Sequence, residues 1–197
     1  MSADNNRRIE SIIRFGLIAE VDYAQAKARV KCGEILTDFL PFITLRSGTT
    51  KTWSPPTKGE QCVILAASGE LTTACIITGL YTQNSPSHSA DEHVIEFADG
   101  AKITYNQANG DLVVTGIKTA TITAANQINI DCPTVNIKGD VNIDGDLSTT
   151  GTTTSKGAIS TQGAISAKGD IKGGNISLQS HVHVAQGEKA RTSKATA

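Results

Sequence analysis

No aromatic residue follows Tyr105 in this chain of 197 residues, although eight aromatic residues lie at or before that position. A globular core uses large rings, whereas a thin column has room only for aliphatic side chains. The missing rings therefore argue against a second globular core. We expect a globular domain first and a fibrous part second.

An excess of one charge and closely spaced cysteine pairs are also lacking. With 18 basic and 19 acidic residues the net charge is −1, which gives no reason to expect nucleic acid or an anionic membrane as partner. No apolar run approaches ~18 residues, so we expect neither a signal peptide nor a transmembrane helix. The four cysteines have no metal-site spacing and are expected to be small buried hydrophobes of a protein made in a reducing cytosol: Cys32, Cys62, Cys75 and Cys132.

Glycine recurs every six residues from Gly139 to Gly169, in the units GDVNID, GDLSTT, GTTTSK, GAISTQ, GAISAK and GDIKGG. A fixed short period predicts a β-helix in which each repeat supplies one strand and one corner and stacks on its neighbours. Glycine suits the corner because it takes positive φ without steric cost. The residues expected to point inward stand two positions after each glycine: Val141, Leu147, Thr153, Ile159, Ile165 and Ile171.

Thr153 departs from this aliphatic pattern, within the stretch TTGTTTS. Its hydroxyl must be hydrogen-bonded if it is buried, so we hypothesise water or an ion on the axis at this level.

A single chain is a poor candidate for such a column. Burying one aliphatic side chain per repeat gains less free energy than ordering six residues costs. Identical chains would supply the missing burial, so we expect an intertwined homo-oligomer, and a trimer for a slender needle. The alternative is a flexible Gly/Ser/Thr-rich linker, but linkers do not keep an aliphatic residue in phase with glycine.

The column is followed by Ser180-His181-Val182-His183. On a strand alternate residues share a face, so His181 and His183 would point the same way. Three chains meeting on an axis would bring six imidazoles together. Six-coordination by imidazole favours iron or nickel over tetrahedral zinc.

The first part of the chain predicts a small all-β barrel, for which we favour the OB-fold. A short helix is expected over residues 4–14, ended by Gly16. The charged face of Lys27, Arg29 and Lys31 is expected to be solvated rather than to bind nucleic acid. Five strands are expected, at residues 16–22, 25–31, 37–45, 61–66 and 75–80.

After a polar linker that contains His88 and adjoins His93, both expected to be exposed, three further strands are predicted at residues 94–98, 101–105 and 111–117. Asp99-Gly100 and Asn109-Gly110 predict two-residue hairpin turns, so the column should begin as a meander. The predicted organisation is an N-terminal segment (1–15), an OB-fold collar (16–85), a linker (86–93), a β-helical shaft (94–178) and an apex (179–197).

Several short motifs of the first part resemble the baseplate assembly protein V family, the central membrane-piercing tail spikes of contractile-tailed bacteriophages. The repeats and the terminal His-x-His extend this resemblance over nearly the whole chain. The motifs are Leu40-Pro41-Phe42, Arg46-Ser47-Gly48, Trp53-Ser54-Pro55-Pro56, Gly59-Glu60-Gln61, Ser68-Gly69-Glu70 and Gly79-Leu80-Tyr81.

The resemblance implies a late structural protein at the baseplate tip of the virion, assembled in the host cytoplasm. It implies a homotrimer with an OB-fold collar, an intertwined triple-stranded β-helix and a metal-bound apex. One iron ion per trimer would be held by His181 and His183 of each chain, with zinc and nickel as less favoured alternatives. The collar would dock to the tail hub, and the shaft would cross the host outer membrane transiently.

Two other functions use parts of the same pattern. A left-handed β-helix acyltransferase also has six-residue repeats, but it needs a catalytic histidine in a cleft between subunits, and both candidate histidines lie at the column's end. A receptor-binding tail fibre would favour exposed aromatic residues at its tip, and this region has none. No pair of carboxylates suggests a glycosidase. We therefore expect no enzymatic activity.

Overall fold

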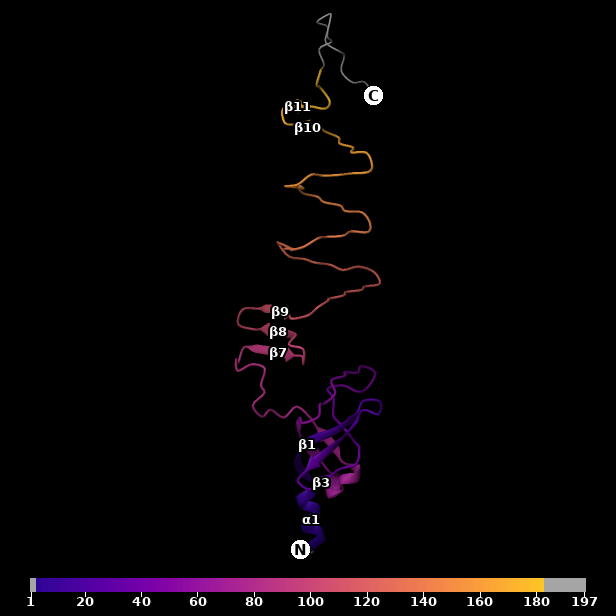
Figure 1. The fold of residues 1–197 in the computed structure, drawn as a ribbon, viewed down its shortest axis with the longest axis vertical. Helices are drawn as coiled ribbons and strands as arrows, with labels where there is room; N and C mark the ends of the chain where they lie inside the picture. Colours follow the sequence, from indigo (N-terminus) through magenta and orange to yellow (C-terminus); the bar gives the residue numbers. More distant parts are fainter. Residues whose placement is uncertain (1–2, 183–197) are drawn as a thin grey trace, which may run out of the picture. The chain divides into compact units, whose positions relative to one another are not determined.

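The computed structural model describes residues 3–182 and is mostly β, with one α-helix, α1 (Ala3–Ser11), among those residues (Figure 1). The chain divides into two units, Met1–Gln127 and Ile128–Ala197. Within the described part no helix is long and apolar enough to cross a membrane.

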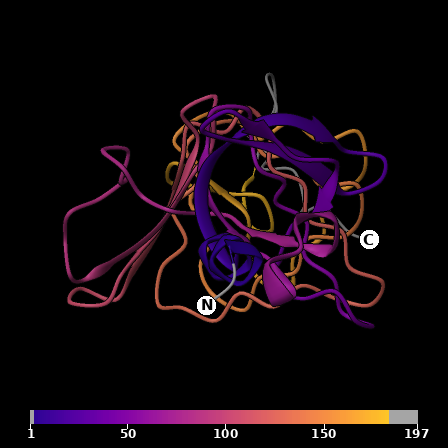
Figure 2. The ribbon, with the colours of Figure 1, turned by 90° about the horizontal axis from the view of Figure 1, so that it is seen from below.

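The first unit contains a small barrel whose strands curve around one core (Figure 2). The hydrogen-bonded order is β3-β2-β1-β5-β6, and β4 also pairs with β2. A parallel bridge between Phe42 and Ile76 joins the chain after β4 to β6, and so closes the sheet. The strands are β1 (Ile13–Asp22), β2 (Lys27–Cys32), β3 (Ile35–Leu36), β4 (Leu40–Pro41), β5 (Gln61–Leu65) and β6 (Cys75–Ile77).

The core of the barrel follows the alternation expected from the sequence. Ala28 and Val30 of β2 are fully buried, while the neighbouring Lys31 is exposed. Two 3₁₀ turns, η1 (Ala67–Gly69) and η2 (Leu71–Thr73), connect β5 to β6. The buried apolar residues of this core are Ile18, Ala28, Val30, Leu40, Cys62, Ile64, Ala66, Ala74 and Ile76. The predicted all-β barrel is confirmed.

Two expected elements have different limits. The helix ends at Ser11 rather than before Gly16, because residues from Ile13 onward pair with β5 and belong to β1. The strand expected over residues 37–45 is reduced to Leu40–Pro41. Here the side chain of Thr37 accepts a hydrogen bond from the Val30 amide at 2.9 Å, and Pro41 has no amide hydrogen to donate.

Gly16 lies on β1 where its backbone runs close to Val30 and Lys31 of β2. A Cβ atom built on it would overlap Val30 Cγ1 and lie 2.8 Å from the carbonyl oxygen of Lys31. We expect Gly16→Ala to lower the free energy of unfolding by about 1–3 kcal/mol, because overpacking forces the strands apart. Thermal unfolding should show a lower melting temperature for the barrel.

Gly48→Ala is the matched control, since a Cβ at Gly48 has no atom within 4 Å and the backbone there is not left-handed. Equal melting temperatures for the two variants would contradict the close approach at Gly16.

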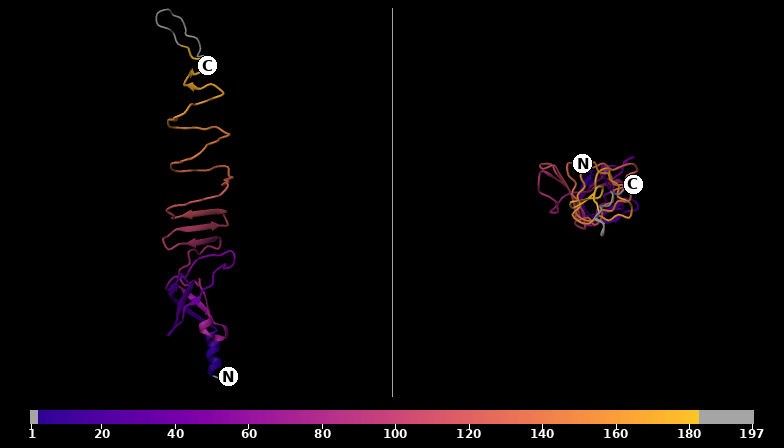
Figure 3. Two further views of the ribbon diagram at one scale, coloured as in Figure 1. Left: turned by 90° about the vertical axis from the view of Figure 1, so that its right-hand side faces the viewer. Right: turned by 90° about the horizontal axis from the view of Figure 1, so that it is seen from above.

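The predicted meander is present as a three-stranded antiparallel sheet of β7 (Glu92–Glu96), β8 (Lys102–Asn106) and β9 (Asp111–Thr115) (Figure 3). The turns are longer than the two residues expected. Phe97 still pairs with Ala101 through a 2.9 Å hydrogen bond, which leaves three residues in the first loop, and four residues separate Asn106 from Asp111. Gly100 and Gly110 close these loops with φ of 87° and 73°, a conformation that suits glycine.

The second unit confirms the six-residue period of the corners. Bends occur at 132–133 and then at 139, 144–145, 150–151, 156–157, 162–163 and 168–169, so each predicted glycine lies in a bend. A left-handed φ is found at Gly139 (139°) and Gly145 (151°), whereas no such φ occurs at the later four glycines.

The strands expected between these bends are not formed within one chain. No described residue of this unit belongs to a strand before β10 (Lys172–Gly173), which pairs with β11 (Ile176–Ser177). Figure 1 shows the chain passing back and forth between β9 and β10 without drawn strands. The strands of the expected intertwined β-helix are therefore not formed by one chain alone, and that β-helix stays a prediction.

Candidate functional site

The residues predicted to point into the column are exposed in the single chain. The exposed fractions of the aliphatic members run from 38% for Ile171 to 73% for Ile159. Exposed apolar surface is unfavourable by roughly 25 cal/mol per Å², and contiguous apolar surfaces mark interaction sites. A regular row of exposed aliphatic side chains without strand partners therefore has the character of an interaction surface.

Thr153 lies in this row and makes a side-chain contact within its own chain. Its hydroxyl is 3.2 Å from that of Thr149, a hydrogen-bonding distance for two hydroxyl groups. The hypothesis of water or an ion at this level stays a prediction.

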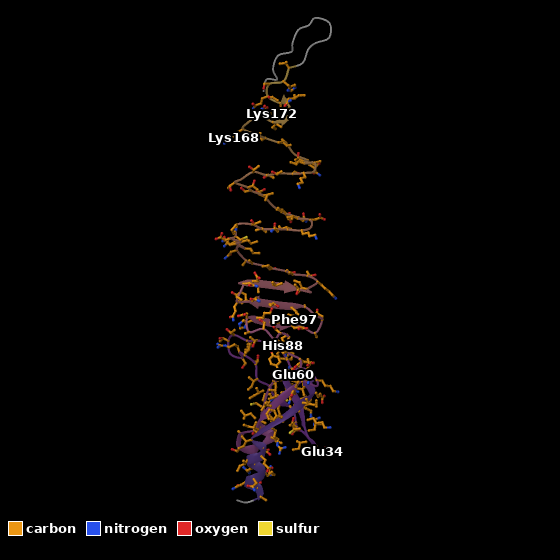
Figure 4. The ribbon with its side chains drawn as sticks, turned by 90° about the vertical axis from the view of Figure 1, so that its left-hand side faces the viewer. Glu34, Glu60, His88, Phe97, Lys168 and Lys172 are labelled. Carbon is orange, nitrogen blue, oxygen red and sulfur yellow. The ribbon has the colours of Figure 1, made fainter. Side chains whose placement is uncertain are left out.

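A hairpin that the sequence analysis did not predict precedes the histidine motif. β10 and β11 are joined by the two residues Gly174 and Asn175, and Gly174 has a φ of 60°. The pair Gly-Asn between two short segments is a signal for a tight hairpin, which could have revealed it. The Leu178 amide donates to the Ile171 carbonyl at 2.8 Å, and this bond fixes the end of the hairpin. Lys168 and Lys172 are labelled at this level of the chain in Figure 4.

His181 follows a turn, not a strand. Its amide donates to the Ser177 carbonyl at 3.0 Å, and residues 178–180 form the turn. The argument that alternate strand residues share a face therefore does not hold for Ser180–Val182. His183 lies outside the described residues.

The His181 ring is half-buried and its Nδ1 lies 3.0 Å from the carbonyl oxygen of Ser177 and 3.2 Å from that of Leu178. Carbonyl oxygens only accept hydrogen bonds, so the hydrogen of the neutral ring is assigned to Nδ1. The lone pair of the ring is then on Nε2, the nitrogen that such a tautomer presents to a metal ion. Residues 3–182 of one chain contain no group of three or more His, Cys, Asp or Glu side chains that could hold a metal ion.

The other two histidines are placed as expected. His88 and His93 are both exposed, and His93 belongs to β7 rather than to the linker.

The four cysteines are free thiols, but they are not uniformly buried. Cys62 lies in the barrel core, where burial raises the pKa of its thiol to about 11, with a smaller effect from Glu60. The thiol therefore stays protonated and unreactive at neutral pH. Cys32 and Cys75 are half-buried and Cys132 is exposed, so the expectation holds for Cys62 and is wrong for Cys132 in the single chain.

The outer face of the barrel is unexpectedly apolar. Phe15 on β1 is aligned with Val63 on β5 and, through it, with Ile77 on β6. Phe15 is 61% exposed, and Ile13 and Leu17 on the same face of β1 are also exposed. Sequence reasoning missed this face because it started the strand at Gly16 and assigned Ile13 to a helix.

The chain was compared with known proteins. Residues 14–81, which span the barrel, match the family described as the type VI secretion system/phage-baseplate injector OB domain. The spike protein of Escherichia phage P2 is 42% identical over 134 residues, which are 67% of this chain and 64% of that protein. The chain thus covers slightly less than two thirds of this relative's length.

The closed barrel and the match over it define an injector-type OB domain. Both matches support the resemblance to the phage baseplate spike family that the motifs predicted. The predicted location in the tail baseplate of the virion is likewise confirmed.

Proposed function

We propose that this chain forms the central trimeric spike of a contractile tail, which crosses the host outer membrane when the tail contracts. The observation that carries the proposal is the row of exposed aliphatic side chains on a column that bends every six residues and has no strand partners of its own. Two further copies would supply those partners. The resulting shaft would be an intertwined, triple-stranded β-helix.

The physical requirements of a piercing device agree with this arrangement. Such a device needs stiffness along its axis and few free strand edges, and it needs no catalytic pocket. Strands interlocked among three chains leave few edges unpaired. The function proposed is therefore structural rather than enzymatic, in keeping with the relative's name of spike protein.

We further propose that one iron ion ties the three chains together at the apex, held by His181 and His183 of each. The residue that the structure describes suits this role, because Nδ1 of His181 faces backbone carbonyls and Nε2 carries the lone pair. One chain alone has no sufficient ligand group within residues 3–182, so the site would need several chains. Nickel and zinc are the alternatives that elemental analysis would separate.

The apolar outer face of the barrel is the surface that we assign to the tail hub. A face on which Phe15 and Ile77 lie in register across three strands has the apolar character of the centre of a protein interface. The contact with the outer membrane would be transient and would follow assembly. We propose no nucleic-acid partner.

The mass of the full chain in solution tests the oligomer directly. We expect light scattering to give three chains per particle, because the exposed rows of three columns would bury one another. A second measurement on the same sample, metal content by elemental analysis, should give one iron per three chains. A monomer that is cleaved by protease throughout residues 128–171 would overturn the proposed shaft.

A further inference from the structure

Residues 43–53 form an arm that leaves the barrel after β4, here called the collar arm. The Ile43 amide donates to the Ile76 carbonyl at 2.8 Å, and the ring of Trp53 lies against that of Phe42 with centroids 6.0 Å apart. Both ends of the arm are therefore fixed to the barrel.

The arm also holds its own shape. The Thr52 amide donates to the Arg46 carbonyl at 3.0 Å, and the Arg46 amide donates to the Thr52 hydroxyl at 3.1 Å. A second link joins the hydroxyls of Thr44 and Thr52 at 2.8 Å. A segment ordered before binding loses less conformational entropy when it docks.

The collar arm exposes one large apolar side chain, Leu45, and two basic residues. Leu45 is 89% exposed, the highest value among the large apolar residues that the structure describes as exposed. Arg46 and Lys51 are its two charged residues, and it contains no acidic residue. No ion pair found among the described residues involves either of these bases. A preformed arm that presents an exposed leucine, next to Arg46 and in the same segment as Lys51, indicates a docking element for an acidic partner with an apolar hollow.

The same unit contains such a hollow. It measures about 970 Å³ and lies between the loop that follows β6 and the β7–β8 hairpin. Its apolar wall includes Tyr81, Ile95 and Phe97, all of which are exposed, and Phe97 is labelled at the hairpin in Figure 4.

The hairpin beside the hollow is acidic. Residues 91–99 carry four carboxylates and no Lys or Arg: Asp91, Glu92, Glu96 and Asp99. Lys102 from β8 pairs with Glu96 at 2.9 Å and offsets one of them. Glu96 lines the hollow, and the other three carboxylates lie on the adjoining hairpin. The collar arm is therefore complementary to this region in two ways: Leu45 to the apolar side chains of the hollow, and the basic residues to the hairpin.

We infer that the collar arm of one chain docks into this hollow of a second copy, with Leu45 against Ile95 and Phe97 and the two bases near the acidic hairpin. Each copy carries one arm and one hollow, so head-to-tail contacts around the threefold axis of the proposed trimer would close into a ring in which neither is left over. This inference rests on the proposed homotrimer and adds an interface in the collar, separate from the column.

Cysteine crosslinking of the full chain tests the contact. Leu45→Cys and Ile95→Cys are combined in a Cys132→Ser background, treated with a short bismaleimide reagent and fully denatured before electrophoresis. We expect covalent dimers and trimers, with trimers closing the ring. Leu45→Cys alone and Ile95→Cys alone are the controls and should stay largely monomeric.

A charge variant of the crosslinking pair provides a second test. Added to the crosslinking pair, Arg46→Glu with Lys51→Glu should lower the yield of covalent trimer at least several-fold, whereas the matched Lys31→Glu with Lys58→Glu should not. Light scattering on each variant separates the possible failures. The docking is wrong if particles of three chains form no crosslink, or form one only inside a single chain; the trimer would then still stand. A particle of one chain would overturn the trimer itself.

Discussion

Replacing Ile165 by aspartate should abolish the ordered shaft. If the predicted inward position is correct, the variant places three carboxylates on one axis in an apolar column. The effective penalty is several kcal/mol for each buried ion, so the total is comparable with the whole stability of a typical domain, about 5–15 kcal/mol. Light scattering and protease digestion should show loss of the trimer or of its resistance over residues 128–171.

Ser166→Asp is the matched control for this variant. It adds the same charge one residue later, where an extended backbone points the side chain to the opposite side. Ser166 is exposed in the single chain. Equal protease resistance of the two variants would show that Ile165 does not face the axis.

The same pair of variants would test the proposed crossing of the outer membrane. Tail particles assembled with the Ser166→Asp chain should still release periplasmic enzyme from susceptible cells after contraction. Particles with the Ile165→Asp chain should release much less, because a disordered column cannot transmit force along its axis. Equal release would contradict the proposed role of the column in piercing.

Combining His181→Ala with His183→Ala should remove the metal and leave the trimer. The six proposed ligands are lost together, so the iron content measured by elemental analysis should fall from about one per three chains to background. The mass in solution should remain that of three chains, since the aliphatic column is unchanged. The apex should become more sensitive to protease, because nothing then ties the three chain ends together.

His88→Ala with His93→Ala is the matched control, because both side chains are exposed and lie far along the sequence from the apex motif. This variant should keep its metal. Wild-type metal content in the His181/His183 variant would show that the ion is bound elsewhere.

Local sequence patterns predicted the repeat corners and the meander. Each predicted glycine from Gly139 to Gly169 lies in a bend. The six-residue period predicted these bends because each one depends on residues that are close together in the sequence. The turn lengths were missed, since Asp99-Gly100 marks the left-handed position of a loop without fixing how many residues precede it. Gly16 was misassigned for a different reason, because its role depends on Val30 in another strand.

The sequence by itself determined that a globular part with aromatic side chains precedes an aliphatic column, because composition and period are local properties. Short motifs in a fixed order also indicated the resemblance to the baseplate spike family, which the comparisons support. Only the tertiary structure decided how the barrel closes through Phe42 and Ile76 and which face of β1 is left exposed. It also decided that the collar arm and the hollow beside the acidic hairpin occur in one unit. These features depend on residues far apart in the chain, whose pairing is set by packing rather than by local preference.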